Sequence, residues 1–181
     1  NSSIIGEKAN YTRPEIEQLI FSPKEKNDNI EKTLYLTRRR IENKIKSLNI
    51  NNFYICSLSS EVIIYKGMFL AEQLSSFYPD LLDSDFKSKF AVYHQRYSTN
   101  TFPTWSLAQP FRVLAHNGEI NTLKGNINWM KAHETRITHD FFAERVEDLK
   151  PILDSDASDS ASLDAAFEIL LQTDRSLPMT K

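Results

Sequence analysis

The sequence has only one cysteine, Cys56, and four glycines among its 181 residues. A single cysteine excludes a disulfide framework and a cysteine-rich metal site within the chain. No apolar run approaches the ~20 residues that a membrane-spanning helix needs, and no signal peptide opens the chain. These absences predict a protein of a reducing compartment such as the cytoplasm, with no membrane as its partner.

The chain also lacks an excess of charge of either sign, because 22 Lys and Arg face 24 Asp and Glu. This balance gives no electrostatic reason to expect a nucleic-acid partner. The one dense basic run, residues 38–40, lies in an expected helix, where a solvated helix face is the commoner role. The 40% hydrophobic and 11% aromatic content fits one globular domain.

The spacing of apolar residues predicts helices that begin near residue 13 and that cover 31–48, 68–77, 121–136 and about 160–172. Asn121 or Thr122 is the expected cap of the fourth helix. The expected apolar stripe of the last helix contains Leu163, Phe167, Leu170 and Leu171. Strands are expected over 52–58, 61–67, 90–98 and 110–117. This order, without a βαβ rhythm, predicts an α+β fold with helices on largely antiparallel sheets.

Polar residues with chemistry to offer follow two of these strands and precede the last helix. Arg96 offers a planar fork that matches a carboxylate, and Asp159 offers an anion for an ammonium group. Together they suit both charged groups of an α-amino acid. Asn117 offers a side-chain amide N–H and Gly118 a backbone N–H, and two such donors aimed at one point form an oxyanion hole. The combination suggests acyl transfer on an amino-acid substrate.

Taken singly, each of these residues has a commoner structural role. Arg96 is typical of a salt bridge, Asn117-Gly118 of a tight turn and Asp159 of a helix cap. The histidines at 94 and 116 suit packing at strand ends, and two histidines do not make a metal site. The residues alone leave both interpretations open.

A family resemblance favours the site. The run "FAVYHQRYSTNTFPTWSLAQPFRVLAHNGEINTLKGNINWM", residues 90–130, resembles the glutamine amidotransferase domain of glutamate synthase large subunits. The likeness continues through "SDSASLD" and "RSLPMTK", and it also includes "EKANYTRPEIEQLIF" and "FYICSLSSEVIIYKGMFLAEQL". It implies that residues 1–181 are part of one such domain, with the αββα sandwich of N-terminal nucleophile hydrolases.

The resemblance also implies roles for individual residues. Arg96 is expected to bind the α-carboxylate of glutamine, with Thr99 nearby, and Asp159 its α-ammonium group. Asn117 and Gly118 are expected to form the oxyanion hole, so that the tight turn expected at this pair would also serve catalysis.

The nucleophile of this family is a cysteine at the first residue of the mature chain, whereas residue 1 here is Asn. Cys56, inside an apolar strand-like run, is expected to be a buried structural thiol. We therefore expect a piece of the domain that lacks its nucleophile and has no glutaminase activity by itself.

The parent protein implied by the resemblance makes glutamate from 2-oxoglutarate with ammonia released from glutamine. It would bind FMN and a 3Fe–4S cluster in synthase domains outside this segment, with no cofactor and no metal in the segment itself. NADPH, oxidised by a small partner subunit, or ferredoxin would supply electrons; the motif favours NADPH, and a ferredoxin type would place the protein in a plastid. Two alternatives stay open, namely another class II amidotransferase of amino-sugar, purine or asparagine synthesis, and a non-catalytic amino-acid-binding module.

Overall fold

The structure, a computed structural model, describes residues 2–95, 102–154 and 157–180. The chain forms two compact units. Unit 1 consists of Asn1–Gln18 and Ile64–Asn117, and unit 2 of Leu19–Ile63 and Gly118–Lys181. Each unit has a hydrophobic cluster of its own.

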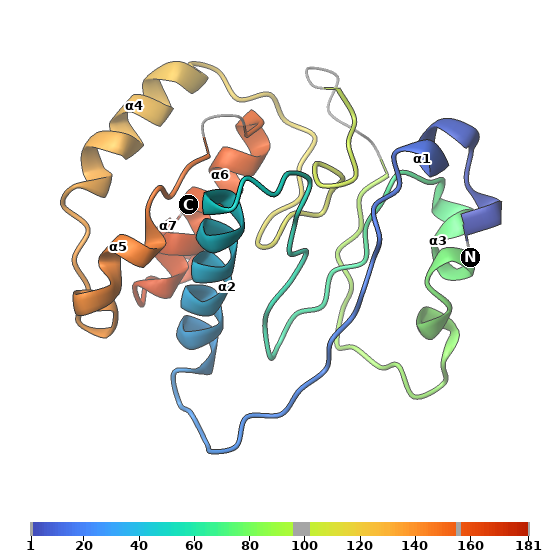
Figure 1. The fold of residues 1–181 in the computed structure, drawn as a ribbon, viewed down its shortest axis with the longest axis horizontal. Helices are drawn as coiled ribbons and strands as arrows, with labels where there is room; N and C mark the ends of the chain where they lie inside the picture. Colours follow the sequence, from blue (N-terminus) through green and yellow to red (C-terminus); the bar gives the residue numbers. More distant parts are fainter. Residues whose placement is uncertain (1, 96–101, 155–156, 181) are drawn as a thin grey trace. The chain divides into compact units, whose positions relative to one another are not determined.

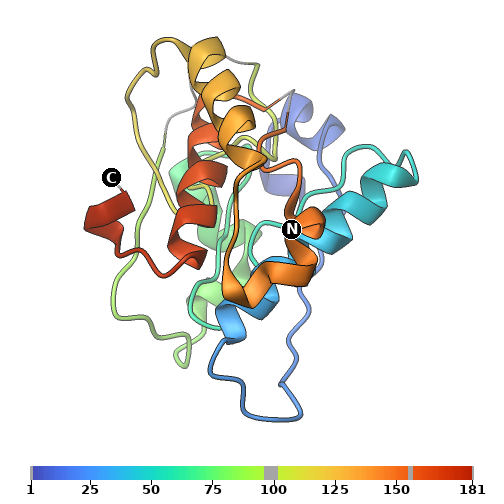
Figure 2. The ribbon, with the colours of Figure 1, turned by 90° about the vertical axis from the view of Figure 1, so that its left-hand side faces the viewer.

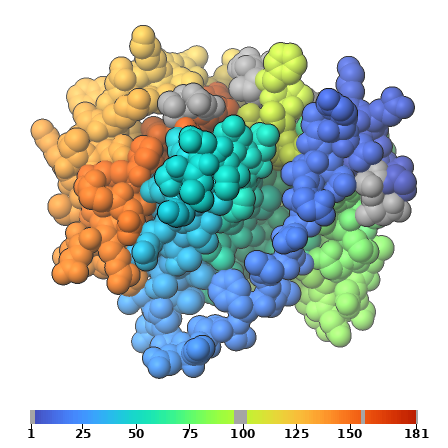
Figure 3. Space-filling view, viewed as in Figure 1, coloured from blue at the N-terminus to red at the C-terminus, as the bar shows by residue number. Residues whose placement is uncertain are grey.

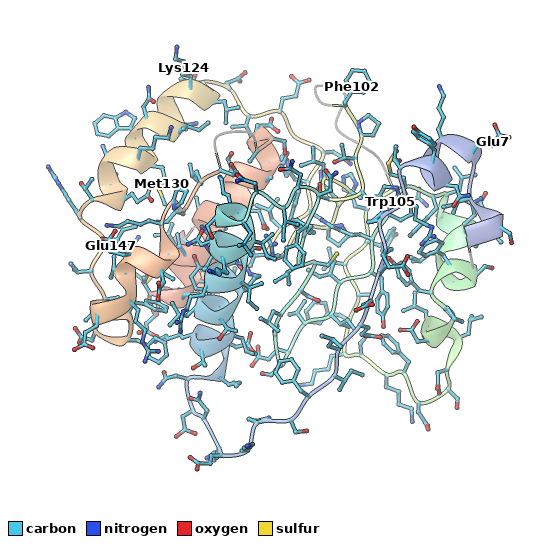
Figure 4. The ribbon with its side chains drawn as sticks, in the orientation of Figure 1. Glu7, Phe102, Trp105, Lys124, Met130 and Glu147 are labelled. Atoms are coloured by element: carbon cyan, nitrogen blue, oxygen red, sulfur yellow. The ribbon has the colours of Figure 1, made fainter. Side chains whose placement is uncertain are left out.

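Unit 1 contains short helices around an aromatic core. They are η1 (Ser2–Ile4), α1 (Glu7–Tyr11), η2 (Ala71–Gln73), α3 (Leu74–Phe77) and η3 (Pro79–Leu82). Ile5, Phe77 and Trp105 form the buried core, and Phe69 and Tyr78 pack against it. The indole N–H of Trp105, labelled in Figure 4, donates to the carbonyl oxygen of Ala9 at 3.1 Å, which ties α1 to this core.

Unit 2 contains the longer helices. They are α2 (Ile30–Ser47), α4 (Leu123–Glu134), η4 (Asp140–Arg145), α5 (Val146–Leu149), α6 (Asp159–Gln172) and α7 (Leu177–Thr180). Helix α2 packs against α5 and α6, and α4 lies beside α6 (Figures 1 and 2). The core between them consists of Tyr35, Leu36, Phe142, Leu149, Ile152, Leu153 and Ile169.

Local sequence explains where α2 ends. Asn49 adopts the left-handed region with φ of 55°, which Asn tolerates better than most residues. The N–H of Ile50 then bonds to the oxygen of Ile45 at 3.2 Å, and the N–H of Asn49 bonds to that of Lys46 at 3.0 Å. These two bonds are a Schellman motif, which satisfies carbonyl groups that the helix end leaves over. The exposed segment 19–29, which leads into α2, crosses the lower part of the face shown in Figure 3.

The three longest predicted helices are confirmed as α2, α4 and α6, within two residues at each end. The prediction over 68–77 is confirmed only from residue 71 on, by η2 and α3. Thr122 occupies the N-cap position of α4, but its side chain makes no capping bond.

The predicted helix from residue 13 is wrong, because α1 lies earlier and the chain from 13 to 20 is not helical. Pro14 disfavours a helical conformation of Arg13, which stops α1 from continuing. Leu19 and Ile20, which would form part of the apolar face of such a helix, are 81% and 90% exposed. No packing therefore stabilises a short helix here.

The four predicted strands are not assigned as strands anywhere in the described part of the chain. In the last of them, residues 110–117, the chain bends at 112–113 and the N–H of Phe111 bonds to the oxygen of Leu114 at 2.9 Å. The sheet layers of the predicted sandwich therefore stay a prediction. Of the two kinds of element in the predicted α+β class, the described residues show the helices only.

Burial in two helices differs from the prediction. The expected stripe of α6 is only half-buried, whereas Ser160, Ser162, Asp164 and Ile169 are buried. The basic run of α2 is not a solvated face either, since Arg38 is buried and only Arg40 extends into solvent. Cys56 is half-buried rather than buried.

Candidate functional site

The five predicted site residues differ in what the structure says of them. Arg96 and Thr99 lie outside the described residues. Asn117 is the last residue of unit 1, Gly118 the first of unit 2, and Asp159 belongs to unit 2. Only Asn117 and Gly118, neighbours in sequence, are brought together by the described structure. The gathering of all five around one substrate stays a prediction.

Asn117 and Gly118 do not form the tight turn that Asn-Gly usually marks. No turn is assigned over residues 114–120, and both residues are exposed. Neither has a positive φ, although a two-residue Asn-Gly hairpin turn requires positive φ at both positions. The turn interpretation of this pair is therefore wrong, and the pair needs another explanation.

The main chain directly before Asn117 is fixed by side chains. The N–H of His116 donates to Oε1 of Gln109 at 2.8 Å, and Nε2 of Gln109 donates to the oxygen of His116 at 2.9 Å. Nε2 of His94 lies 3.1 Å from the same oxygen. Because a carbonyl only accepts, this nitrogen of His94 carries the proton that it shares. Three bonds thus meet at one residue of the backbone.

The loop that contains Gln109 has a buried base in unit 1. Ala108 and Phe111, on either side of Gln109, are 3% and 4% exposed. The ammonium group of Lys66 lies 5.2 Å from the centre of the Phe111 ring and donates to the oxygen of Ser106 at 2.7 Å. Gln109 was not among the predicted residues, because no local pattern shows that its amide reaches a backbone seven positions later.

Asp159 is the first residue of α6, but it is not the cap of that helix. The cap is Ser158, whose hydroxyl oxygen accepts from the N–H of Ala161 at 3.1 Å. Oδ1 of Asp159 accepts from the N–H of Ser160 at 2.6 Å and from its hydroxyl at 3.1 Å. A carboxylate at this end also interacts favourably with the helix dipole. The capping interpretation of Asp159 is wrong, since Ser158 satisfies the N–H that the cap serves.

Two other kinds of site are absent from the described residues. No group of three or more His, Cys, Asp or Glu side chains could hold a metal ion there. Across residues 2–95, 102–154 and 157–180, no helix has both the length and the apolar character to cross a membrane.

Comparisons with known proteins agree on one family. The family described as glutamine amidotransferases class-II matches residues 1–180. The chain is 63% identical over 183 residues to the glutamate synthase [NADPH] large chain of Azospirillum brasilense, covering 100% of this chain and 12% of that protein. It is 48% identical over 179 residues to the chloroplastic ferredoxin-dependent glutamate synthase of Oryza sativa subsp. japonica, covering 97% of this chain and 11% of that protein.

A third relative is the glutamate synthase [NADPH] large chain of Bacillus subtilis, 46% identical over 178 residues that cover 97% of this chain and 12% of the relative. The chain thus spans about an eighth of the length of the curated relatives that it matches.

Proposed function

The chain belongs to the class II glutamine amidotransferases, and we propose that it forms part of the amidotransferase domain of a glutamate synthase. This domain releases ammonia from glutamine, and synthase domains of the same protein use the ammonia to convert 2-oxoglutarate to glutamate. The observation that carries the proposal is the 63% identity, over the whole chain, to a glutamate synthase large chain. Units 1 and 2 are proposed as parts of one domain, because the family match includes both.

In this proposal Arg96 binds the α-carboxylate of glutamine through two parallel hydrogen bonds, with Thr99 beside it. Asp159 binds the α-ammonium group. Two features support the role of Asp159: Ser158 already caps α6, and Asp159 is half-buried at the end of the helix. The two charged contacts would orient the side-chain amide of glutamine toward the reacting groups.

Asn117 and Gly118 are proposed as the oxyanion hole. A cysteine thiolate attacks the side-chain amide carbon of glutamine, and the carbonyl oxygen becomes negative as the new C–S bond forms. The two N–H donors stabilise that charge until the C–N bond breaks. The base that took the thiol proton gives it to the amide nitrogen, which leaves as ammonia. Water then hydrolyses the thioester to glutamate. The exposure of both residues, where a substrate can reach them, supports the role.

The nucleophile of the family is the cysteine at the first residue of the mature chain, with its own α-amino group as the base. Cys56 lacks such an amino group, because its nitrogen is part of a peptide bond. We therefore propose that Cys56 is no nucleophile and that residues 1–181 alone do not hydrolyse glutamine. Glutamine hydrolysis by the purified segment, lost in Cys56→Ala, would contradict this.

The redox cofactors of the parent protein are assigned to other parts of it. An iron–sulfur cluster is held by several cysteine thiolates, whereas this chain has one cysteine. The residues present therefore do not fit the 3Fe–4S cluster, and no step of the reaction proposed for this segment uses it or FMN.

The electron donor is proposed to be NADPH, oxidised by a small partner subunit, in the cytoplasm. The support is the 63% identity to the NADPH-type chain of Azospirillum. The Bacillus NADPH-type chain adds nothing to it, because its 46% identity lies within the 43–48% range of the ferredoxin-dependent relatives. Oxidation of NADPH by the full-length protein together with its small subunit, or of reduced ferredoxin by the full-length protein alone, each with glutamine and 2-oxoglutarate, decides between the two. A ferredoxin type would favour a plastid.

The fold proposed for the complete domain is the αββα sandwich of N-terminal nucleophile hydrolases. The family match supports it, and α2, α4 and α6 would be the helices that cover the sheets.

Steady-state kinetics of glutamine hydrolysis by the full-length protein test the site. Arg96→Ala and Asp159→Asn should mainly raise KM, because they remove contacts present in both the ground state and the transition state. Asn117→Ala should lower kcat by ~10²–10³-fold with little change in KM. Asp28→Asn, on the exposed loop before α2, is the control. Wild-type kinetics in all three site variants would refute the proposed roles.

A further inference from the structure

We infer that Gln109 is a positioning residue for the glutaminase reaction, acting through the main chain of His116 on Asn117. The inference rests on the proposed function, because it concerns the oxyanion donor assigned there. The observation behind it is the pair of hydrogen bonds, 2.8 and 2.9 Å long, between the side-chain amide of Gln109 and the main chain of His116. We call this two-point contact the clamp.

The contact fixes a peptide plane rather than a side chain. The carbonyl of His116 belongs to the planar peptide unit that also contains the N–H of Asn117 and ends at the Cα of Asn117. Gln109 binds both polar groups of His116, and His94 bonds to the same carbonyl oxygen at 3.1 Å. Together with the φ angle of Asn117, the orientation of this plane determines where the Cα–Cβ bond of Asn117 points. The position of the Asn117 amide therefore depends on Gln109.

The clamp is attached to a rigid base. Ala108 and Phe111, which flank Gln109, are buried, and Trp105 is anchored to α1 by its bond to Ala9. The N–H of Phe111 also closes the loop by its bond to Leu114. Asn117 itself is exposed, so the clamp, rather than burial of its own side chain, restrains it. This restraint matters because oxyanion donors act only within ~2.7–3.1 Å of the developing charge.

The chemistry of the clamp selects an amide side chain. Binding a backbone N–H and a backbone C=O together requires one acceptor and one donor. Asn and Gln present these on two separate neighbouring atoms, whereas a hydroxyl has both on one atom and a neutral His has them on different sides of its ring. A glutamate at position 109 keeps the acceptor for the N–H of His116. It offers a donor to the carbonyl only when its carboxyl is protonated. The effect of Gln109→Glu should therefore depend on pH.

The test compares glutamine hydrolysis by the full-length wild-type protein with that of Gln109→Leu, Gln109→Glu, Asn117→Ala and Gln109→Leu/Asn117→Ala. Gln109→Leu should lower kcat by about 10- to 100-fold, the loss expected for a misplacement of up to about 1 Å, with little change in KM. In the Asn117→Ala background most of this loss should disappear, because the residue through which Gln109 acts is gone. The kcat of Gln109→Glu relative to wild type should rise as the pH is lowered, while that of Gln109→Leu should not.

Gln73→Leu is the matched control. Gln73 also lies in unit 1, and its amide also binds two backbone groups, the N–H of Leu70 at 2.8 Å and the oxygen of Ile4. It should lose stability like Gln109→Leu but keep the wild-type kcat. If Gln73→Leu lowers kcat equally, Gln109 is an ordinary structural residue and the inference is wrong.

The other outcomes separate this inference from the proposed function. An unchanged kcat in Gln109→Leu, or an equal loss in both Asn117 backgrounds, overturns the inference while Asn117→Ala still tests the oxyanion role. An unchanged kcat in Asn117→Ala instead refutes the oxyanion role itself. If Gln109→Leu does not fold, the near-isosteric Gln109→Glu decides, because a loss that does not recover at low pH contradicts the clamp.

Discussion

Removing the buried guanidinium of Arg38 should destabilise the contact between α2 and α6 and reduce the effect of a second substitution, Glu168→Gln. Nη1 of Arg38 lies 2.9 Å from both carboxylate oxygens of Glu42, and Nη2 lies 2.5 Å from Oε2 of Glu168. The guanidinium carbon lies 5.3 Å from the centre of the Tyr35 ring. Burial opposes the charge of Arg38, but Glu168 and Glu42 outweigh it and raise the pKa of the guanidinium above its ordinary value.

The size of the effect follows from burial. The Arg38 side chain is 3% exposed and that of Glu168 12%. Removing one member of such a pair costs about 3–5 kcal/mol, because the other charge stays buried without its partner. In Arg38→Met, Glu42 keeps its ion pair with Arg39 at 3.0 Å. Most of the lost stability therefore comes from the broken pair between Arg38 and Glu168. We expect a cost near the lower limit, about 3 kcal/mol.

Hydrogen–deuterium exchange of the backbone amides in α2 and α6 measures this cost locally. A loss of 3 kcal/mol corresponds to exchange that is roughly 100-fold faster in Arg38→Met. Glu168→Gln should speed exchange in the wild type, since it removes a partner of Arg38. In Arg38→Met the same Glu168→Gln should speed exchange less than it does in the wild type, because the ion pair that it breaks is already gone. Asp28→Asn, which breaks an exposed pair with Lys26, is the control and should change little.

An equal effect of Glu168→Gln in both backgrounds would refute the reasoning. It would mean that the ion pair between Arg38 and Glu168 contributes no coupling free energy to the stability of this contact.

Two further predictions concern the two units separately. A Cβ added at Gly67 would meet the rings of Phe69 and Trp105, so Gly67→Ala should cost ~1–3 kcal/mol in urea denaturation followed by tryptophan fluorescence. Gly6→Ala, whose Cβ would meet nothing within 4 Å, is its control, and equal stability of the two variants would contradict the overpacking. In unit 2, the hydrogen bond from Lys32 and then that from His139 hold the pKa of Asp174 below its ordinary value. A lowered carboxyl pKa stabilises the fold above the ordinary carboxyl value near 4 and loses that contribution as the pH falls through the folded value. The free energy of unfolding should therefore decline less below pH 4 in Asp174→Asn, and an unchanged acid profile would exclude the contribution.

The helices illustrate what local pattern can predict. The regions 31–48, 121–136 and 160–172 could be read from the sequence because a helix repeats every 3.6 residues and its ends have chemical signals. The region from residue 13 carried similar signals and is not helical, because such signals cannot supply the packing surface that a short helix needs. Strand prediction depends even more on distant partners, since a strand bonds to another segment rather than to itself.

The candidate site divides in the same way. The residue types at 96, 117, 118 and 159, with their family context, indicated an amidotransferase before any coordinates. The sequence could not show that Ser158 rather than Asp159 caps α6, or that Asn117-Gly118 makes no turn. Both depend on backbone geometry that several residue choices permit.

The family, the candidate substrate-binding residues and the three long helices could be predicted without coordinates, because each is encoded by neighbouring residues. Only the tertiary structure decided that Arg38 is buried between carboxylates and that the Gln109 amide binds the backbone of His116. The partners of Arg38 include one 130 positions away, and those of Gln109 lie seven positions on. Such contacts form where the folded chain brings segments together, and no spacing along the sequence specifies them.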